Sequence, residues 1–325
     1  MTESNQPLVS IIVITYNSSK YVLETLESAK SQTYQNIELI ISDDCSTDNT
    51  IEICRNWIKN NADRFVKTEI ITVESNTGIP TNCNRGIDIS KGVWIKLIAG
   101  DDVLTDDCIY NNLVYINENE NMKIKILQSS MNYYSNYFTD CNFIKTRSLN
   151  DNIISDNNIT AELQYRLLLR GCLVNTPSVF AQKNIYINLG GFDESLSIED
   201  WPMWLKVLSS GIKIHYLDKI TIKYRVRNDS MCNENIDNKI YNNHFIRERP
   251  LYEKYIYPNI SFCEKHFLQI HFLRLKFLSR YFNENKLLNK LISKITTVPF
   301  WLYSNCYIKI IHLIIKQRLK NDELY

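Results

Sequence analysis

The sequence VSIIVITYNSS at residues 9–19 opens with a run, Val9 to Thr15, made almost entirely of aliphatic and β-branched residues. A continuous apolar run of this kind predicts a strand buried on both faces, as in a parallel sheet. Tyr16, Asn17 and two serines then end the run with polar groups. Because parallel strands need long crossovers, we expect helices to cover both faces of this sheet.

The same alternation of apolar and amphipathic stretches continues to about residue 98. Further strands are expected at 37–42, 68–73 and 93–98, and helices at about 20–32, 46–61 and 81–89. This βαβα order is typical of a parallel sheet covered by helices. Ligands of such sheets bind beyond the carboxyl ends of the strands, so the residues directly after each strand are the first functional candidates.

The second half of the chain has weaker patterns. A polar, Asn-rich stretch at 140–158 is expected to be a mobile loop, and a helix should follow at about 161–170. We then expect a short strand after Pro177, a turn at Gly190-Gly191, a helix that starts at Glu199-Asp200, and a pair of strands near 213–227.

Composition excludes several classes of protein. A formal net charge of +1 argues against a protein that coats nucleic acid, since such domains carry a strong basic excess. The nine cysteines include no CxxC pair, which favours reduced thiols over a zinc site or a disulfide framework. The first residues do not resemble a signal peptide, and no run of 18 apolar residues occurs. We therefore expect a cytoplasmic protein without a membrane span.

Asp101 and Asp102 follow the predicted strand at 93–98 after only Ala99 and Gly100. Two adjacent carboxylates can hold a hard divalent cation such as Mg²⁺ or Mn²⁺, together with substrate phosphates and water. The alternative is a solvated loop or an N-cap for a helix from Thr105 onward. Gly100, which allows close backbone approach, favours the metal site.

Over roughly residues 8–230, the chain resembles family 2 glycosyltransferases. The resemblance is carried by VSIIVITYNSSKYVLETLESAKSQTYQNIELIISDDCSTDNT at 9–50, NTGIPTNCNRGIDISKGVWIKLIAGDDVL at 76–104, GGFDE at 190–194, IEDWPMWLKV at 198–207 and YRVRNDS at 224–230. It implies the GT-A fold, a Rossmann-like α/β architecture with a mostly parallel sheet flanked by helices. The implied activity is transfer of a sugar from a nucleotide-sugar donor.

Carried over by position, the resemblance also implies site residues. The nucleotide-sugar-binding positions are Thr15, Tyr16, Asn17, Asp43, Asn84, Asp101 and Arg227. Within this set, Tyr16 would stack on the base and Asp43 would accept a hydrogen bond from a base N–H. Asp102 would bind the metal directly, with Asp101 as a second metal residue nearer the ribose or sugar. The metal would bridge the two phosphates as a Lewis acid.

Glu199 and Asp200 resemble the ED motif of the family, in which the aspartate is the general base. One carboxylate suffices for a single in-line displacement, so inversion at the anomeric carbon is implied. Pro202 is tolerated only in the first turn of a helix, which places Asp200 at the positive end of a helix dipole. A plain N-cap is the alternative. Glu199 would orient the acceptor, and by analogy Trp201, Thr176 and Ser178 would line the acceptor side.

Three positions depart from the family pattern. Arg227 stands where the YRxH segment has a histidine that can help hold the metal. An arginine cannot bind a cation, so Arg227 is assigned to the diphosphate oxygens. Cys83 replaces a frequent Arg or Lys, and Ala99 replaces an acid found in many relatives.

We expect a catalytic domain at 1–235, with a nucleotide-sugar-binding half at 1–125 and an acceptor half at 126–235, and a basic helical extension at 236–325. Residues 251–325 contain 12 Lys or Arg and 5 Asp or Glu, a local charge of +7. Asn305, Lys309, His312 and Lys316 share one face of a predicted helix that is otherwise apolar. That helix could pack on the core or lie at an anionic membrane surface.

The sequence hypothesis is therefore transfer of a sugar from a nucleotide sugar, with a UDP-sugar as the expected donor. The acceptor would be a glycan hydroxyl, for example on a lipid-linked intermediate of bacterial surface polysaccharide. Two alternatives stay open. A sugar nucleotidyltransferase would need a Gly-rich phosphate loop, which TYNSS lacks. A non-catalytic scaffold could keep the fold without turnover.

Overall fold

The structure is a computed structural model that describes residues 6–147, 153–156, 158–227, 244–284, 286–300 and 302, with side chains omitted for 244–247. Two compact units are present. Unit 1 comprises residues 1–157 and 172–226, and unit 2 comprises 158–171 and 227–325. The predicted division at residue 235 stays a prediction.

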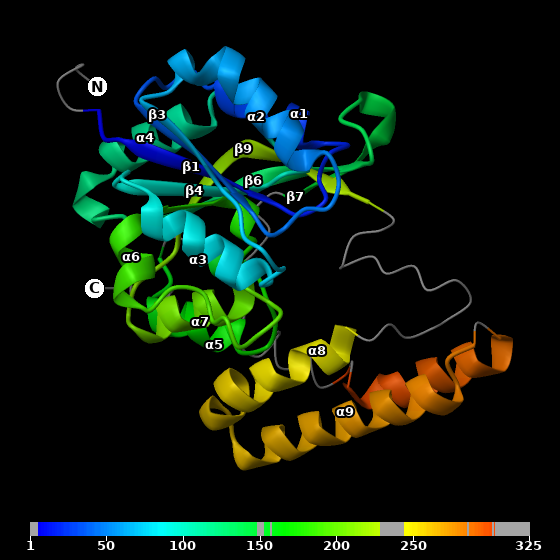
Figure 1. The fold of residues 1–325 in the computed structure, drawn as a ribbon. Helices are drawn as coiled ribbons and strands as arrows, with labels where there is room; N and C mark the ends of the chain where they lie inside the picture. The colour runs from blue at the N-terminus through cyan, green and yellow to red at the C-terminus, as the bar shows by residue number, and fades with distance from the viewer. Residues whose placement is uncertain are drawn as a thin grey trace. The chain divides into compact units, whose positions relative to one another are not determined.

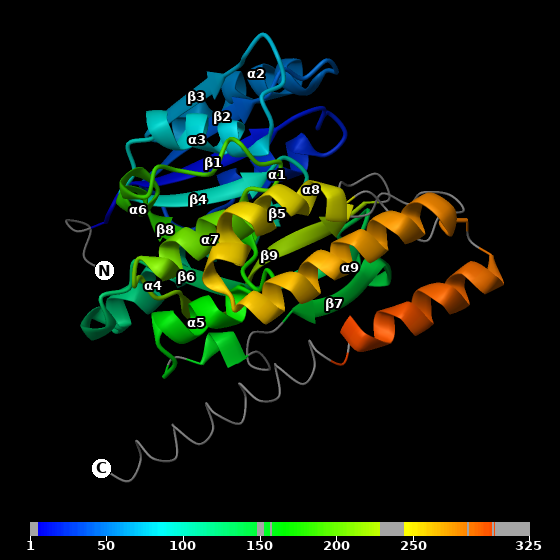
Figure 2. The same ribbon diagram turned by 90° about the horizontal axis from the view of Figure 1, so that it is seen from below.

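The first half of unit 1 alternates strands and helices as expected. Its elements are β1 (Val9–Thr15), α1 (Val22–Lys30), β2 (Ile37–Asp43), α2 (Thr50–Asn61), β3 (Lys67–Ile71), α3 (Ile79–Ile89) and β4 (Trp94–Ala99). Parallel pairing joins these strands in the order β3-β2-β1-β4. Figure 2 shows β1 and β4 running side by side.

The remainder of unit 1 extends the sheet. It adds β5 (Val103–Leu104), α4 (Cys108–Glu118), β6 (Ile126–Ser135), β7 (Phe143–Arg147), the short turn η6 (Thr176–Ser178), β8 (Val179–Gln182), α6 (Lys183–Asn188), α7 (Asp200–Ser209) and β9 (His215–Val226). The described strands form one sheet in the order β3-β2-β1-β4-β8-β6-β9-β5, with β7 paired to β6. Beyond β4 the ladders are antiparallel except between β6 and β9, so the sheet is mixed.

Helices cover both faces of the sheet (Figure 1). Alternate residues of β1, namely Val9, Ile11 and Val13, pack in one core with residues of α1, α2 and α4. The other face of β1 contacts α3, where a Cβ on Gly86 would lie 2.4 Å from Ile12 Cγ2. A strand buried on both faces explains why β1 reads as an uninterrupted apolar run.

The prediction of a mobile loop at 140–158 is partly wrong. Residues 143–147 form β7, which pairs antiparallel with β6 at the edge of the sheet. Its side chains are largely exposed, so the segment lacks the apolar alternation that usually reveals a strand. Residues 148–152 and 157 lie outside the described part of the chain.

The expected pair of strands near 213–227 is also wrong, because one long strand, β9, occupies this region. Residues Asp218 to Ile220 of this strand are exposed and lie where the register with β6 shifts. Such a bulge bends a strand without ending it. The sequence patterns predicted neither α4 nor β6.

Unit 2 contains helices in its described residues. They are α5 (Ala161–Leu168), α8 (His244–Leu251), α9 (Phe262–Tyr281) and a further helix at 287–300. A capping box begins α9, in which Ser261 and Glu264 each satisfy a backbone N–H of the other residue. None of the described helices has the length and apolar character needed to span a bilayer. The predicted polar face at Asn305, Lys309, His312 and Lys316 lies outside the described residues.

Candidate active site

Asp43, the last residue of β2, lies beside Thr15, the last residue of β1. The Asp43 carboxylate is buried and accepts hydrogen bonds from Thr15 Oγ1 at 2.8 Å, from Ser46 Oγ at 2.5 Å and from the Ser46 backbone N–H at 2.8 Å. These three donors fix its orientation at the carboxyl edge of the sheet. An ionised carboxylate held in this way can only accept hydrogen bonds from a ligand.

Tyr16 and Asn17 follow Thr15 at the same edge. The ring of Tyr16 is half exposed, as a stacking surface must be. Asn17 adopts a left-handed backbone with φ of 50°, and its side-chain oxygen accepts from the Thr47 backbone N–H at 2.8 Å. The Asn17 N–H donates to Ser46 Oγ, so the two loops that flank Asp43 are tied together.

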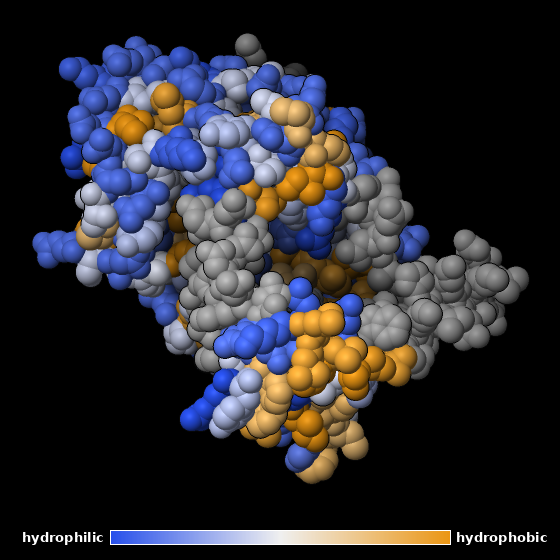
Figure 3. Space-filling view, turned by 90° about the vertical axis from the view of Figure 1, so that its right-hand side faces the viewer, coloured by the Kyte–Doolittle hydropathy of each residue, from blue (hydrophilic) through white to orange (hydrophobic). Residues whose placement is uncertain are grey.

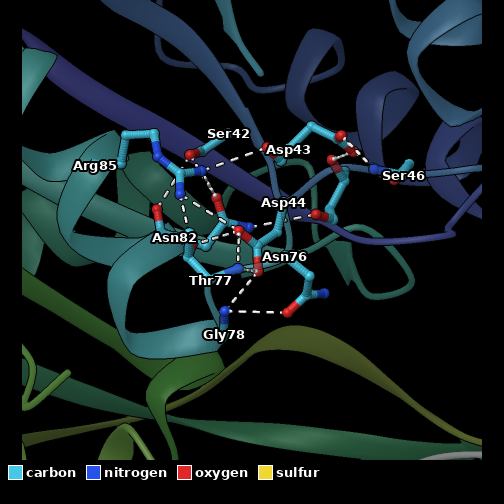
Figure 4. A network of polar contacts seen from close by, with 10 residues as sticks. Ser42, Asp43, Asp44, Ser46, Asn76, Thr77, Gly78, Asn82 and Arg85 are labelled. Carbon is cyan, nitrogen blue, oxygen red and sulfur yellow. Dashed lines mark hydrogen bonds and ion pairs between the residues drawn. The ribbon is translucent and has the colours of Figure 1, made fainter. Parts of the chain in front are cut away.

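Asp44 has a different surrounding from Asp43 (Figure 4). Its carboxylate accepts from the backbone N–H groups of Thr77 and Gly78 and from the Arg85 guanidinium at 3.3 Å. Arg85 also donates to Thr77 Oγ1 and, at 3.4 Å, to the Asp43 carbonyl oxygen. Asp44 and Arg85 therefore brace the loop behind Asp43. Sequence reasoning missed Arg85, although a buried acid pair signals the need for a cation.

Asp101 and Asp102 follow β4, on the other side of β1 from Asp43. A Cβ on Gly100 would lie 2.9 Å from Thr15 Cγ2, so glycine is required for this close approach. Asp102 is buried, and its Oδ1 accepts from the Arg225 backbone N–H at 2.8 Å. Asp101 is half-buried. The carboxyl ends of β2, β1 and β4 thus bring together Asp43, Thr15 and the acidic pair.

Arg225 in β9 is fully buried beneath this pair. Its Nε donates to the Asp101 carbonyl oxygen at 2.7 Å, and its other nitrogens donate to the Asn136 carbonyl oxygen and to Glu24 Oε2. The guanidinium also lies over the rings of Tyr21 and Phe138, at 4.3 and 4.1 Å from their centroids. Arg225 is a positioning residue for the acidic pair. Sequence reasoning overlooked it in favour of Arg227, which directly follows β9.

Glu199 and Asp200 lie at the start of α7. Asp200 Oδ1 accepts from the Trp201 backbone N–H at 2.6 Å, and the Cys172 thiol lies 3.5 Å from Oδ2 as a donor. Burial and the neighbouring charge of Asp200 raise the pKa of Glu199 from 4.5 to about 8. The first turn of a helix favours negative charge. Burial and the charge of Asp200 therefore favour the protonated form of Glu199.

Trp201, Thr176 and Ser178, the predicted acceptor residues, are all buried. The hydroxyl of Thr176 has no hydrogen-bond partner among the described residues, whereas Ser178 Oγ donates to the Asn175 carbonyl oxygen. Lys96 of β4 holds this segment, since its Nζ donates to the Pro177 carbonyl oxygen at 2.6 Å. Burial lowers the pKa of Lys96. A lysine inside the apolar run VWIKLIAG was the signal for this contact.

The side chain of Asn84 forms hydrogen bonds within the protein. Its side-chain nitrogen donates to the Phe192 carbonyl oxygen and to Glu194 Oε1, and its oxygen accepts from the Phe192 N–H. Both amide hydrogens are thus used to hold the GGFDE segment against α3. A nucleotide sugar that accepts a hydrogen bond from the Asn84 side-chain nitrogen would have to replace one of these bonds.

Comparisons with known proteins identify the family of this chain. Residues 10–173 match the family described as Glycosyl transferase family 2. The chain belongs to this family. It is a glycosyltransferase, and the expected fold class is confirmed. The similarity noted from sequence motifs is confirmed as well.

Individual relatives of this glycosyltransferase are moderately similar. The Escherichia coli protein named UDP-Glc:alpha-D-GlcNAc-diphosphoundecaprenol beta-1,3-glucosyltransferase WfaP is 32% identical over 69% of this chain and 79% of its own length. Glycosyltransferase GlyG of Streptococcus pneumoniae is 36% identical over 31% of this chain and 33% of its own length. The structure of S. aureus TarS 1–349 in complex with UDP-GlcNAc aligns with a TM-score of 0.58 and 19% identity, over 91% of this chain and 79% of that one. The last similarity concerns the fold.

The carboxylates of Asp101 and Asp102 are the candidate metal ligands of this glycosyltransferase. Among the described residues, no cluster of three or more His, Cys, Asp or Glu could hold a metal. Mg²⁺, however, is commonly held by one or two carboxylates, with phosphates and water as its other ligands. Asp101 and Asp102 supply such a donor set, so the residues fit a metal that arrives with a diphosphate.

Replacing Glu199 with Gln should change the pH dependence of stability. Folded wild type keeps the Glu199 proton to about pH 8, whereas the unfolded chain releases it near 4.5. Wild-type stability must therefore fall as pH rises between these values. The Glu199→Gln variant does not lose stability in this way, so its stability should rise relative to that of the wild type as pH increases from about 5 to 8. Each unit of pKa difference corresponds to about 1.4 kcal/mol, or roughly 2–4 °C in Tm at this size.

Thermal unfolding of both proteins across this pH range measures the effect. The exposed Glu118 at the end of α4 offers a control, and Glu118→Gln should follow wild type at every pH. Parallel curves for Glu199→Gln and wild type would show that Glu199 is ionised in the folded state.

Proposed function

We propose that this glycosyltransferase moves a sugar from a UDP-sugar to a hydroxyl of a glycan acceptor, with inversion at the anomeric carbon. The observation that carries the proposal is the meeting of Asp43 and the acidic pair at the carboxyl ends of β2 and β4, on either side of β1. The end of this edge with Asp43 suits a base, and the end with the acidic pair suits a metal-bound diphosphate. The names of WfaP and of the TarS complex, which mention UDP-Glc and UDP-GlcNAc, favour uridine as the base.

In the proposed complex, uracil stacks on the half-exposed ring of Tyr16 and its N–H donates to Asp43. Because Thr15 and Ser46 already fix the Asp43 carboxylate, donor binding needs no reorientation of this group. A buried acceptor-only group discriminates against bases that lack a donor at that edge. Asn17 holds the loop beside the ring, and Thr15 holds the carboxylate.

The diphosphate is assigned to the acidic pair. Asp102, with Asp101 beside it, would hold Mg²⁺ or Mn²⁺, and Arg227 would donate to the phosphate oxygens. The metal, when bound, supplies Lewis-acid stabilisation of the charge on the leaving diphosphate. Arg225 contributes indirectly, because its side chain holds the Asp101 carbonyl oxygen and its backbone N–H holds the Asp102 carboxylate.

Asp200 is assigned the role of general base. The acceptor oxygen attacks the anomeric carbon while its proton passes to Asp200, and the bond from that carbon to the phosphate oxygen breaks. The electron pair leaves with the nucleoside diphosphate. Glu199, which holds its proton at neutral pH, can donate a hydrogen bond to the acceptor. The orphaned hydroxyl of Thr176 is the acceptor-side position with unmet hydrogen-bonding capacity.

For the acceptor we propose a lipid-linked intermediate of bacterial surface polysaccharide, used at the cytoplasmic face of a membrane. The name of WfaP specifies a diphosphoundecaprenol-linked sugar, which supports this acceptor class. The basic C-terminal residues would bring the enzyme to the membrane that contains such an acceptor. No role for nucleic acid is proposed.

Hydrolysis of a panel of nucleotide sugars, with and without Mg²⁺ or Mn²⁺, tests the proposal. We expect release of UDP from one or more UDP-sugars, loss of this release with a chelator, and no detectable release by Asp102→Ala. Asp43→Asn should weaken UDP binding, and Asp106→Ala, which replaces an exposed acid in the loop after β5, serves as a control. Metal-independent turnover, or equal turnover of sugars with other bases, would overturn the assignments of Asp102 and Asp43.

A further inference from the structure

The helix α9 and the helix at 287–300 pack together as an antiparallel pair, which we name the C-terminal hairpin. Phe267 and Phe300 lie 4.6 Å apart between ring centroids. Arg274 donates to Thr296 Oγ1 and Thr297 Oγ1 at 3.0 and 2.9 Å. Contacts between early residues of one helix and late residues of the other define the antiparallel arrangement. One face of each helix is thereby occupied.

A second face of each helix exposes large apolar side chains. In the part of the chain that the structure describes, 22 large hydrophobic residues are exposed, and 11 of them lie between residues 262 and 302. Figure 3 shows hydrophobic residues gathered on the helical unit. The 11 residues are Phe262, Ile270, Leu273, Phe277, Tyr281, Leu287, Leu288, Leu291, Ile295, Val298 and Leu302. Scattered exposed apolar residues are ordinary, but a concentration of this kind marks a binding surface.

The spacing of these residues forms a stripe along each helix. In α9, Ile270, Leu273, Phe277 and Tyr281 are three or four residues apart, and therefore share a face. In the following helix, Leu287, Leu291, Ile295 and Val298 repeat the same spacing. An apolar stripe that the packing of the hairpin leaves uncovered is expected of a helix that lies at an interface.

Rows of cations run beside both stripes. Lys276 and Arg280 each directly precede a stripe residue of α9, and Lys286, Lys290 and Lys294 do the same in the following segment. All five side chains are exposed. The acids of this region are paired, since Glu264 binds Arg170 and Glu284 binds Lys286. Residues 261–300 carry seven Lys or Arg and two Asp or Glu, a net charge of +5.

We infer that the C-terminal hairpin is a docking surface for an anionic lipid membrane. Its apolar stripes would enter the interfacial region while the flanking lysines and arginines reach the lipid phosphates. Charge complementarity favours this occupant over a second copy of the chain, because two such faces would place the exposed cations of one copy against those of the other. The inference deepens the proposed function by naming a partner for it, and it rests on a surface remote in sequence from the assigned site residues.

Vesicle flotation of the full-length protein tests this inference. We expect the wild type to float with phosphatidylcholine–phosphatidylglycerol vesicles and to stay unbound with phosphatidylcholine alone. Combined Phe277→Ser, Leu287→Ser, Leu291→Ser and Ile295→Ser should weaken binding to the anionic vesicles by about tenfold or more. Combined Lys286→Gln, Lys290→Gln and Lys294→Gln should weaken it by a similar factor and remove most of its salt dependence.

The matched control replaces exposed apolar residues elsewhere, with Val66→Ser, Ile144→Ser and Ile187→Ser in one protein. This control should bind vesicles like the wild type, and circular dichroism should show all variants folded. Failure of the wild type to float with anionic vesicles overturns the inference. Equal loss in the control also overturns it, as does a dimer in light scattering that the apolar variant abolishes without any vesicle binding. Flotation requires no turnover, so its failure is distinguishable from failure of the proposed function.

Discussion

Asp200→Asn should lower the rate of sugar transfer by roughly 10²–10⁴-fold, the range that a positioned general base contributes. An asparagine keeps the size of the side chain and can still accept from the Trp201 backbone N–H at the start of α7. It cannot take the acceptor proton. The loss should therefore fall on kcat, with the dissociation constant of UDP changed by less than about twofold.

Single-turnover kinetics with the donor found in the panel, together with calorimetric titration of UDP, separate these two quantities. Asp193→Asn is the matched control, because Asp193 in the GGFDE segment accepts a hydrogen bond from the hydroxyl of the following Ser195. It should retain wild-type kcat. If Asp200→Asn kept more than about a tenth of the wild-type rate, the general base would have to be another group.

Arg225→Met should lower both stability and donor binding. The substitution leaves the carbonyl oxygens of Asp101 and Asn136 without their buried donor and removes the partner of Glu24. Lost charged hydrogen bonds of this kind cost roughly 2–5 kcal/mol in total. Because the backbone of Asp101 loses its support, we also expect binding of UDP in the presence of Mn²⁺ to weaken by about tenfold or more.

Arg64→Met is the matched control for this experiment. Arg64 likewise donates to several backbone carbonyl oxygens, including those of Lys30, Gln32 and Tyr34, but it lies away from the acidic pair. Urea unfolding should show a loss of stability for both variants, whereas Mn²⁺-dependent UDP binding should fall only for Arg225→Met. If the Met variant fails to fold, UDP binding can be measured instead on Arg225→Lys, which keeps a buried cation. Equal donor binding by Arg225→Met and Arg64→Met would limit Arg225 to a structural role.

The local sequence determined the first half of the fold and the positions of its acids. Uninterrupted apolar runs such as Val9–Thr15 can only be satisfied by strands covered on both faces. Once those strands are parallel, their carboxyl ends must share one edge, so Asp43 and Asp101-Asp102 could be brought together without coordinates. Pro202 likewise fixed the start of α7, because the proline ring excludes it from later turns.

The roles that depend on contacts distant in sequence were decided only by the tertiary structure. The Arg225 side chain donates to the Asp101 carbonyl oxygen across 124 residues, and Lys96 donates to the Pro177 carbonyl oxygen across 81. Periodicity reports how a residue relates to its own helix or strand, and it carries no information on partners brought in by another element. The bulge that keeps β9 a single strand arises from its pairing with β6. The acids of the site were therefore visible in the sequence, while the cations that hold them in place were visible only in the folded chain.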